Sequence, residues 1–263
     1  MKVKFIARGR LGNAIFRYMA SAVICIFLKA DYCVEEPNKC NIDMTDEYFL
    51  SIAERIINNK QIEGFCDDDN IIMSKYYQHD LIYKKYKTHI INFIKEHPTH
   101  YVLTDGILAG DCNYQKFYMN DIVNVPTNFN KKYKNVLHIR LEDFVTHNLC
   151  LDKNRITNLL EKKIINDELC IVCNQPSTCF EFEYIKYITD YLISKNICCH
   201  LEHNDVLTDY YIMKEAELLI CSKSTLSWCA AFFSTNIKKC YLPDYIVTPN
   251  STCKFPTDNT ELY

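Results

Sequence analysis

The sequence predicts an α/β protein built from two domains, and three observations support this fold class. At the start of the chain, KVKFIA (2–7) alternates with period two and leads through GRLGN (9–13) into the apolar segment AIFRYMASAVICIFL (14–28). This pattern is typical of a strand, a Gly turn and a buried helix. Beyond residue 134, strand-like and helix-like segments alternate, which favours parallel sheets covered on both faces. Between the two halves lies VNVPTNFNKKYK (123–134), a polar segment with a proline and several Asn residues.

That polar segment is the predicted boundary between an acceptor-side domain over residues 1–128 and a second, nucleotide-sugar (donor) binding domain over 129–263. A chain of 263 residues is long enough for one large domain or two small ones. Its composition, 48% hydrophobic and 24% charged, is ordinary for a globular protein with a sizeable core. The net charge of −3 comes with no basic stripe or tail, so we expect no nucleic-acid partner.

The elements of the first half follow from local patterns. After the first helix, residues 31–48 have the composition of a loop, 46–60 combine strand and helix patterns, and 62–77 are irregular. Apolar residues at helical spacing predict a helix over 79–97 that ends before a proline. Residues 99–118 predict a strand, a Gly-containing loop and a further helix.

The second half consists of alternating strands and helices. Apolar runs predict strands at 134–141, 168–174, 196–203, 217–222 and 238–244. Segments between them predict helices at 155–165, 180–194, 207–216 and 224–234. In parallel sheets of this kind, ligands bind beyond the carboxyl ends of the strands, so we expect the functional residues there.

Fifteen cysteines raise the question of a disulfide framework. Their number is odd, the chain is not small, and many of them lie inside apolar runs, where a free cysteine behaves as a small buried hydrophobe. Cys170 and Cys173 lie three apart on a predicted strand and so point to opposite faces, which disfavours a zinc half-site. We therefore expect reduced cysteines and a soluble, cytoplasmic protein.

The N-terminal stretch could also be a signal peptide or a membrane anchor. Its apolar run from Met19 to Leu28 has ten residues, short of the roughly 20 that span a bilayer. Basic residues precede this run, but no small-residue cleavage site follows it. The folded interpretation, with Asn13 as the N-cap of the helix, is favoured, and we expect no transmembrane segment.

Three segments carry residue types suited to an anionic ligand, and each adjoins a predicted strand. GRLGN (9–13) places two glycines between a strand and a helix, where backbone amides can approach an anion. HIRLEDF (138–144) puts His138 and Arg140 on one face of a strand, with two acids after them. Arg suits a diphosphate because its planar fork makes paired, charge-assisted hydrogen bonds. A salt bridge between Arg140 and a neighbouring carboxylate is the simpler interpretation.

The third segment is SKST (222–225), which follows a buried strand and begins a hydrophobic helix with the only Trp of the chain. Hydroxyls and amides at a helix start can hold phosphate or sugar oxygens. The simpler interpretation is N-capping by Ser224 or Thr225.

Together these segments resemble the α-1,2-fucosyltransferases and their relatives. GRLGNAIFRY is similar to the G-x-L-G-N-x-x-F-x-Y opening of that family, and HIRLEDF to its H-x-R-x-x-D-Y segment. DYYIMKEAELLICSKSTLSWCAAFF is similar, without a gap, to its stretch from D-F-x-L-M to S-N-S-S-F-S-W-W-G-A-W. DGILAGDCNYQKFY is similar to the loop before the family's donor domain. The anchors occur in the family's order from residue 9 to residue 233.

The resemblance implies a compact GT-B architecture, that is, two facing Rossmann-like domains, with GDP-fucose held chiefly by the second. It implies an inverting glycosyltransferase that moves fucose to a hydroxyl of a glycan acceptor and requires no metal or other cofactor. Arg140 would bind the diphosphate leaving group, and His138 would orient the donor or its nucleotide. Further donor contacts are implied for Ser222, Lys223, Ser224, Thr225 and Asn174, with Gly12 and Asn13 on the opposite side of the cleft.

A catalytic base must accept the proton of the acceptor hydroxyl within hydrogen-bond reach. Asp143 is the first candidate, with Glu142 and His138 as alternatives. A purely structural role for Asp143, as an N-cap, stays open beside the catalytic one.

The chain departs from the family pattern at several positions. Leu141 stands where the family has a second Arg, Glu142 where it has Gly, and Cys229 where it has a second Trp. Lys223 replaces an Asn and adds a positive charge near the expected phosphates. These departures leave open a different nucleotide sugar as donor, or a non-catalytic relative that binds sugar nucleotides or glycans.

An enzymatic rival is a metal-dependent glycosyltransferase that holds its cation with Asp67, Asp68 and Asp69. These acids lie in a polar loop and not clearly at a strand end, which disfavours this mechanism. His200 and His203 form a pair near a predicted strand end, a placement that is more often structural than metal-binding.

Overall fold

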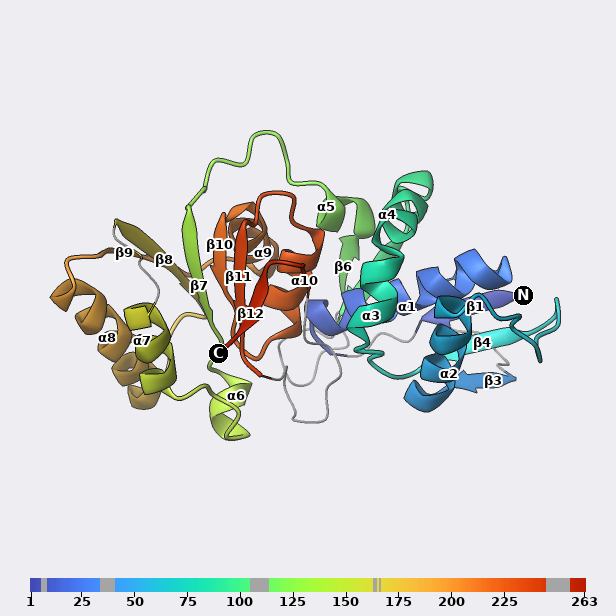
Figure 1. Cartoon of the computed structure of the whole chain (residues 1–263), viewed down its shortest axis with the longest axis horizontal. Coiled ribbons are helices and arrows are strands. Elements are labelled where there is room, and N and C mark those ends of the chain that lie inside the picture. Colours follow the sequence, from blue (N-terminus) through green and yellow to red (C-terminus); the bar gives the residue numbers. More distant parts are fainter. Residues whose placement is uncertain (6–8, 34–40, 105–113, 163–164, 166, 245–255) are drawn as a thin grey trace. The chain divides into compact units, whose positions relative to one another are not determined.

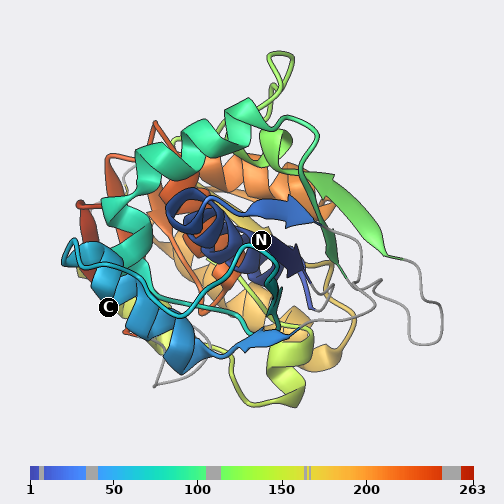
Figure 2. The ribbon, with the colours of Figure 1, turned by 90° about the vertical axis from the view of Figure 1, so that its right-hand side faces the viewer.

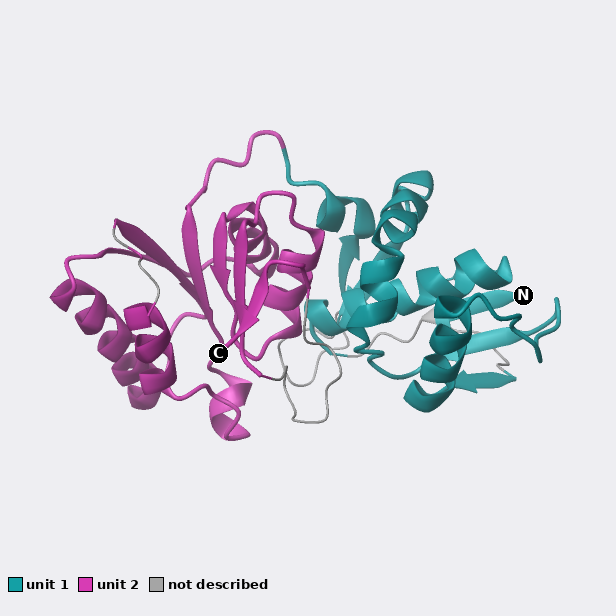
Figure 3. Ribbon diagram, in the orientation of Figure 1, with its two compact units in different colours: residues 1–126 teal, residues 127–263 magenta. Residues whose placement is uncertain are grey.

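The structure of the protein, a computed structural model, describes residues 1–5, 9–33, 41–104, 114–162, 165, 167–244 and 256–263. The chain divides into two compact units, residues 1–126 and 127–263 (Figure 3). Each unit contains a parallel sheet and helices (Figure 1), so the predicted α/β class is confirmed. The assignment of the two halves as acceptor side and donor side stays a prediction.

Unit 1 is built on a four-stranded parallel sheet with the strand order β2-β1-β4-β3. Its strands are β1 (Lys2–Phe5), β2 (Asp31–Cys33), β3 (Ile42–Met44) and β4 (Asn70–Met73). An antiparallel pair of strands, β5 (Tyr101–Thr104) and β6 (Gln115–Tyr118), forms a separate ribbon. The helices of this unit are α1 (Leu11–Leu28), α2 (Asp46–Ile57), α3 (Asp80–Lys85), α4 (Lys87–Glu96) and α5 (Met119–Val123).

Helix α1 is the central element of unit 1, in contact with β1, β2, β5 and α4 (Figure 2). It begins at Leu11 with Arg10 at the N-cap position, so the prediction of Asn13 as N-cap is wrong. The helical pattern starts three residues earlier than the apolar run suggested, and Asn13 lies inside the first turn.

Among the described residues, α1 alone is long and apolar enough to cross a membrane, with a mean hydropathy of 1.7 over 18 residues. The run of ten apolar residues counted in the sequence is therefore shorter than the apolar helix in the structure. However, 78% of the window is buried inside the structure, as expected for a helix in a protein core. Length and composition alone are weak support for a membrane span.

Several predictions for unit 1 are corrected by the structure. The mixed segment 46–60 contains a single helix, α2, whose N-cap Thr45 accepts a hydrogen bond from the Tyr48 amide. The segment interpreted as irregular contains β4, and the helix expected over 79–97 is two helices separated at Tyr86. Residues 115–118 form a strand where a helix was expected, and the Gly-containing loop (105–113) lies outside the described residues.

Unit 2 contains a six-stranded sheet in which every neighbouring pair is parallel. Its strands are β7 (Asn135–Ile139), β8 (Glu168–Cys173), β9 (Cys198–Glu202), β10 (Leu218–Ile220), β11 (Lys239–Leu242) and β12 (Thr260–Leu262). All five predicted strands of this half are confirmed, and β12 was not predicted. The order β12-β11-β10-β7-β8-β9 corresponds to the doubly wound order 3-2-1-4-5-6 read from the opposite edge.

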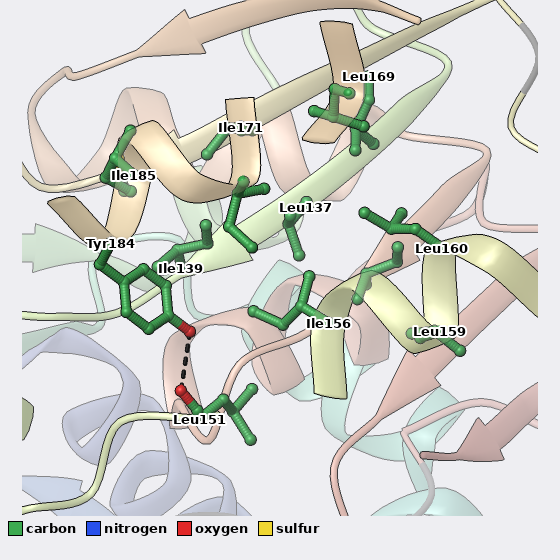
Figure 4. Close-up of a cluster of buried hydrophobic side chains, with 14 of the residues drawn as sticks. Leu137, Ile139, Leu151, Ile156, Leu159, Leu160, Leu169, Ile171, Tyr184 and Ile185 are labelled. Carbon is green, nitrogen blue, oxygen red and sulfur yellow. Dashed lines mark hydrogen bonds between the residues drawn. The ribbon is translucent and has the colours of Figure 1, made fainter. Parts of the chain in front are cut away.

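The helices of unit 2 cover both faces of this sheet. They are α6 (Asp143–Thr146), α7 (Lys153–Lys162), α8 (Cys179–Ser194), α9 (Val206–Glu215) and α10 (Thr225–Phe233). Leu137 and Ile139 of β7 pack in one hydrophobic cluster with side chains of α7 and α8 (Figure 4). Helix α9 contacts β7 and β8 and packs on α10. Because side chains alternate along a strand, His138 belongs to the face opposite that cluster.

No disulfide joins the described cysteines, and their redox state stays a prediction. Cys170 and Cys173 both lie in β8 and are buried. Burial is the main cause that raises the pKa of the Cys173 thiol to about 12, so this thiol is protonated at neutral pH.

Candidate functional site

The predicted donor-binding residues of unit 2 gather at the carboxyl ends of β7, β8 and β10. Strands β7 and β10 are neighbours in the middle of the sheet, although they lie about 80 residues apart in the sequence. The chain order runs outward from this pair in both directions, so the gap between them is the topological switch point of the sheet. Open α/β sheets bind their ligands in the crevice at such a point.

A hydrogen bond joins the two strand ends at the switch point. His138 Nδ1 and Ser222 Oγ lie 2.9 Å apart. Burial, and secondarily the positive charge of Arg140, lower the pKa of His138 to about 3, so its imidazole is neutral at physiological pH. A neutral, buried ring bonded to Ser222 is suited to orienting neighbouring groups. It is a weak base.

Arg140 extends from the end of β7 and is held by two side chains of the segment that follows. Its Nη2 lies 3.0 and 3.1 Å from the two carboxylate oxygens of Asp143, and its Nε lies 3.3 Å from one of them. Its guanidinium carbon lies 4.8 Å from the centre of the Phe144 ring. The simpler interpretation of this segment, a salt bridge between Arg140 and a nearby carboxylate, is therefore present. Asp143 lies in the first turn of α6, whose N-cap is Glu142, so Asp143 is not an N-cap.

The turn after β7 contains Glu142, one of the positions that depart from the family pattern. Glu142 has φ 43° and ψ −117°, and the Phe144 amide donates to the Leu141 carbonyl over 2.8 Å. These values are typical of the first central residue of a type II′ turn, a position that favours Gly. Gly is the residue that this backbone conformation favours, and in this chain Glu142 adopts it with a side chain.

We expect Glu142→Val to be about 2 kcal/mol less stable than Glu142→Gly, since a β-branched residue at positive φ is strained by about 1–3 kcal/mol. Both variants lose the Glu142 carboxylate, so their difference is the strain of Val at positive φ minus the extra unfolded-state entropy of Gly. Urea denaturation of the two variants measures it. Equal free energies of unfolding would show that the turn does not need positive φ.

The second strand end continues into helix α10. Ser222 and Lys223 follow β10, and Ser224 caps the helix by accepting a hydrogen bond from the Leu226 amide over 3.2 Å. Thr225 is the first helical residue. The N-capping interpretation is thus confirmed for Ser224. The amides of the first turn and the Lys223 ammonium nevertheless give this end of the helix a positive potential.

Asn174 follows β8 and has a structural partner. Its side-chain oxygen accepts a hydrogen bond from the Leu141 amide over 3.3 Å, which ties the end of β8 to the turn after β7. Glu181 holds the same turn by accepting from the Glu142 amide over 2.9 Å. Burial would raise the pKa of Glu181, but hydrogen bonds from Ser177, Glu142 and Thr178 lower it below its usual value. Glu181 was not predicted as part of this site.

A small cavity lies beneath the switch point. Its lining includes His138 and Arg140 from one strand end and Ser222 and Lys223 from the other. At about 10 Å³ it is far too small to enclose a nucleotide. Two larger hollows in unit 2, of about 440 and 420 Å³, contain none of the predicted residues. Neither shares a lining residue with the small cavity at the switch point, so the switch point is the better candidate site.

The GRLGN segment lies in unit 1, beyond the carboxyl end of β1. Gly9 has φ 77°, and a Cβ there would contact Asn13 at 3.4 Å and Tyr76 at 3.7 Å. The left-handed backbone therefore favours Gly at the first position of the motif. Gly12 and Asn13 belong to the first turn of α1, and their role in a donor-binding cleft stays a prediction.

A group of acids at the end of β9 was not predicted, although its member Asp209 begins the DYYIM part of a family-like segment. Asp209 Oδ1 accepts a hydrogen bond from Asn204 over 3.0 Å. Burial, reinforced by the charges of Asp205 and Glu202, raises the pKa of Asp209 to about 7. Burial also disfavours charge on Glu202, but hydrogen bonds from Lys131, Tyr133 and Asn204 lower its pKa to about 2.

Asp209 predicts a pH dependence of stability. The folded protein keeps this proton up to about pH 7, whereas the unfolded chain releases it near pH 4, so this group destabilises the fold as pH rises through that window. We expect Asp209→Asn to raise the free energy of unfolding by about 1–3 kcal/mol at pH 8 and to leave it unchanged at pH 4. Urea denaturation at both pH values, with Asp190→Asn as an exposed control, measures this. The same gain at both pH values would contradict the assignment.

One acid of the rival metal site, Asp69, has structural partners in unit 1. The two carboxylate oxygens of Asp69 accept hydrogen bonds from the Asn41 side chain and the Cys66 amide, each over 2.6 Å. In unit 2, His203 Nδ1 lies 3.0 Å from the Cys173 carbonyl oxygen. Within the described residues, no three side chains of His, Cys, Asp or Glu are grouped as metal ligands.

Comparison with known proteins adds no relative: no family model matches the chain, and no curated protein matches it.

Proposed function

We propose that this chain is an inverting glycosyltransferase of the GT-B architecture that transfers fucose from GDP-fucose to a hydroxyl of a glycan acceptor without a required metal ion. The proposal rests on the resemblance of three segments to the α-1,2-fucosyltransferases. One structural observation supports it above the others. Two of these segments, 84 residues apart at His138 and Ser222, meet at the switch point of a doubly wound sheet.

In this proposal, the positive groups at the switch point stabilise the diphosphate as it leaves. Arg140 and Lys223 line the same cavity from neighbouring strand ends, so one diphosphate can contact both. Charge develops on the leaving phosphate in the transition state, and fixed donors aimed at such charge are among the strongest catalytic contributions. Neutral His138 would hold Ser222, whose peptide group adjoins the first turn of α10.

Asp143 is the first candidate for the base that accepts the proton of the acceptor hydroxyl. Its side chain is 38% exposed while that of Arg140 is 16% exposed, so the carboxylate is accessible from solvent beside the proposed phosphate site. His138 is less suited because of its lowered pKa.

A different nucleotide sugar is the second candidate donor, and Leu141 supports it. The Leu141 side chain is fully buried in the hydrophobic cluster of unit 2, so this position supplies no second guanidinium beside Arg140. Lys223 supplies one positive charge in place of the missing second guanidinium. Its ammonium group cannot make the paired hydrogen bonds of the planar Arg side chain.

Calorimetric titration with GDP in excess EDTA tests the proposal, with UDP as the control nucleotide. We expect GDP to bind without a divalent cation and more tightly than UDP. GDP-fucose turnover with a panel of free oligosaccharides then tests the transfer. Preference for UDP, or binding only with a divalent cation, would refute the GDP-fucose assignment. Binding of GDP-fucose without turnover on any acceptor would favour the non-catalytic relative.

A further inference from the structure

The last residue of the sequence makes a contact with the proposed nucleotide-binding end of β10. Tyr263 follows β12, the edge strand that was not predicted. Its phenol donates a hydrogen bond to the carbonyl of Cys221 over 2.7 Å, across 42 residues of sequence. The ring packs against the hydrophobic cluster of unit 2. Burial raises the pKa of Tyr263 well above its ordinary value, so the phenol keeps its proton and acts as a donor.

The Cys221 carbonyl belongs to the same peptide group as the Ser222 amide. The described residues contain no cis peptide bond, and in a trans peptide the N–H points away from the C=O. The Cys221 amide donates to the Tyr241 carbonyl of β11 over 2.8 Å. The phenol of Tyr263 therefore fixes the plane of the peptide that precedes Ser222 and Lys223, with the Ser222 N–H directed away from Tyr263.

Tyr263 is itself held from two elements. Its amide donates to the Leu242 carbonyl at the end of β11 over 2.9 Å. The Arg155 guanidinium of α7 lies 5.7 Å from the centre of the Tyr263 ring and also donates to its backbone carbonyl. These contacts fix the position from which the phenol reaches Cys221.

We propose that Tyr263 is a positioning residue that sets the orientation of Ser222 and Lys223 for binding the donor diphosphate. The identity of the ligand in this inference rests on the proposed function. The ordering of the strand end by Tyr263 does not depend on it. In this proposal Tyr263 acts through the peptide between Cys221 and Ser222 and not through contact with the ligand.

Tyr263→Phe in the full chain tests the inference, because it removes one hydroxyl and keeps the ring. Tyr86→Phe is the matched control: its phenol donates to the Ile56 carbonyl over 3.1 Å in unit 1. We expect Tyr263→Phe to speed amide hydrogen exchange at residues 222–224 about tenfold and to weaken GDP binding about fivefold, the effect of one net hydrogen bond. Tyr86→Phe should change neither, even if both variants lose similar thermal stability.

The two readouts separate this inference from the proposed function. If the wild-type protein does not bind GDP, the proposed donor is wrong, and the exchange comparison still decides whether Tyr263 orders the strand end. Equal exchange at residues 222–224 in Tyr263→Phe and the wild type overturns the positioning role. Faster exchange with unchanged GDP affinity also overturns it, because Tyr263 would then have a structural role only.

Discussion

Arg140→Ala is expected to weaken GDP binding by at least 100-fold and to remove GDP-fucose turnover. A charge-assisted contact to a leaving group contributes about 3–4 kcal/mol to the transition state, and each 1.36 kcal/mol corresponds to a factor of ten. Arg140 lies at the switch point, where its orientation is set by Asp143 and Phe144. Removing it leaves Lys223 as the remaining cation in the lining of the cavity described above.

Arg140→Lys separates charge from geometry. Lys keeps the positive charge but cannot make the paired hydrogen bonds of a planar guanidinium, so we expect an intermediate loss of GDP affinity. Arg55→Ala is the matched control, because Arg55 belongs to α2 of unit 1 and its Nε donates to the Gln61 carbonyl over 3.2 Å. Calorimetry with GDP and thermal unfolding of each variant are the measurements. GDP affinity within threefold of wild type for Arg140→Ala would place the phosphates elsewhere.

The sheet of unit 2 was predictable because buried parallel strands form continuous apolar runs. ELCIVC became β8 and LLI became β10, each within the predicted segment. Strand β12 was not predictable, since its three residues TEL are partly or fully exposed. Its strand conformation depends on pairing with β11. This tertiary contact joins two segments that are not adjacent in the sequence, so a local pattern does not reveal it.

The break between α3 and α4 was not predictable for a similar reason. Apolar residues keep helical spacing across Tyr86, so the periodicity continues through the break. The Tyr86 phenol donates to the Ile56 carbonyl at the end of α2, and its ring packs edge-on against Phe27. Both are tertiary contacts, and local helix propensity does not predict them.

For the candidate site, the residue types and their places at strand ends were predictable from the sequence. The particular side chains that pair with His138 and Arg140 were not. The letters HIRLEDF place His138 and Arg140 at a strand end, but only the strand order brings Ser222 to His138. Two acids follow Arg140, and the sequence does not distinguish which of them pairs with it; the turn geometry directs Asp143 to it. The positive φ of Glu142 was likewise not predictable from the sequence, because Glu is not typical of a type II′ turn.

The role of Asp143 is the second prediction with a large expected effect. As the proposed base, it should contribute about 10²–10⁴-fold to the rate of transfer. We expect Asp143→Asn to lower kcat for fucose transfer by at least 100-fold, because Asn cannot accept the acceptor proton. GDP should bind with unchanged or higher affinity, since the variant removes a negative charge about 3 Å from the Arg140 guanidinium.

Asp190→Asn is the matched control, because Asp190 pairs with Lys186 on the exposed surface of α8 over 2.5 Å. The measurements are kcat with GDP-fucose and an accepted oligosaccharide, and the GDP dissociation constant by calorimetry, each at two salt concentrations. An increase in GDP affinity that is larger at low salt identifies the lost charge as its cause. If kcat for Asp143→Asn stays within tenfold of wild type, Asp143 serves only as the counter-ion of Arg140. Exposed Glu142 would then be the next candidate for the base, because the lowered pKa of His138 makes its ring a poor proton acceptor.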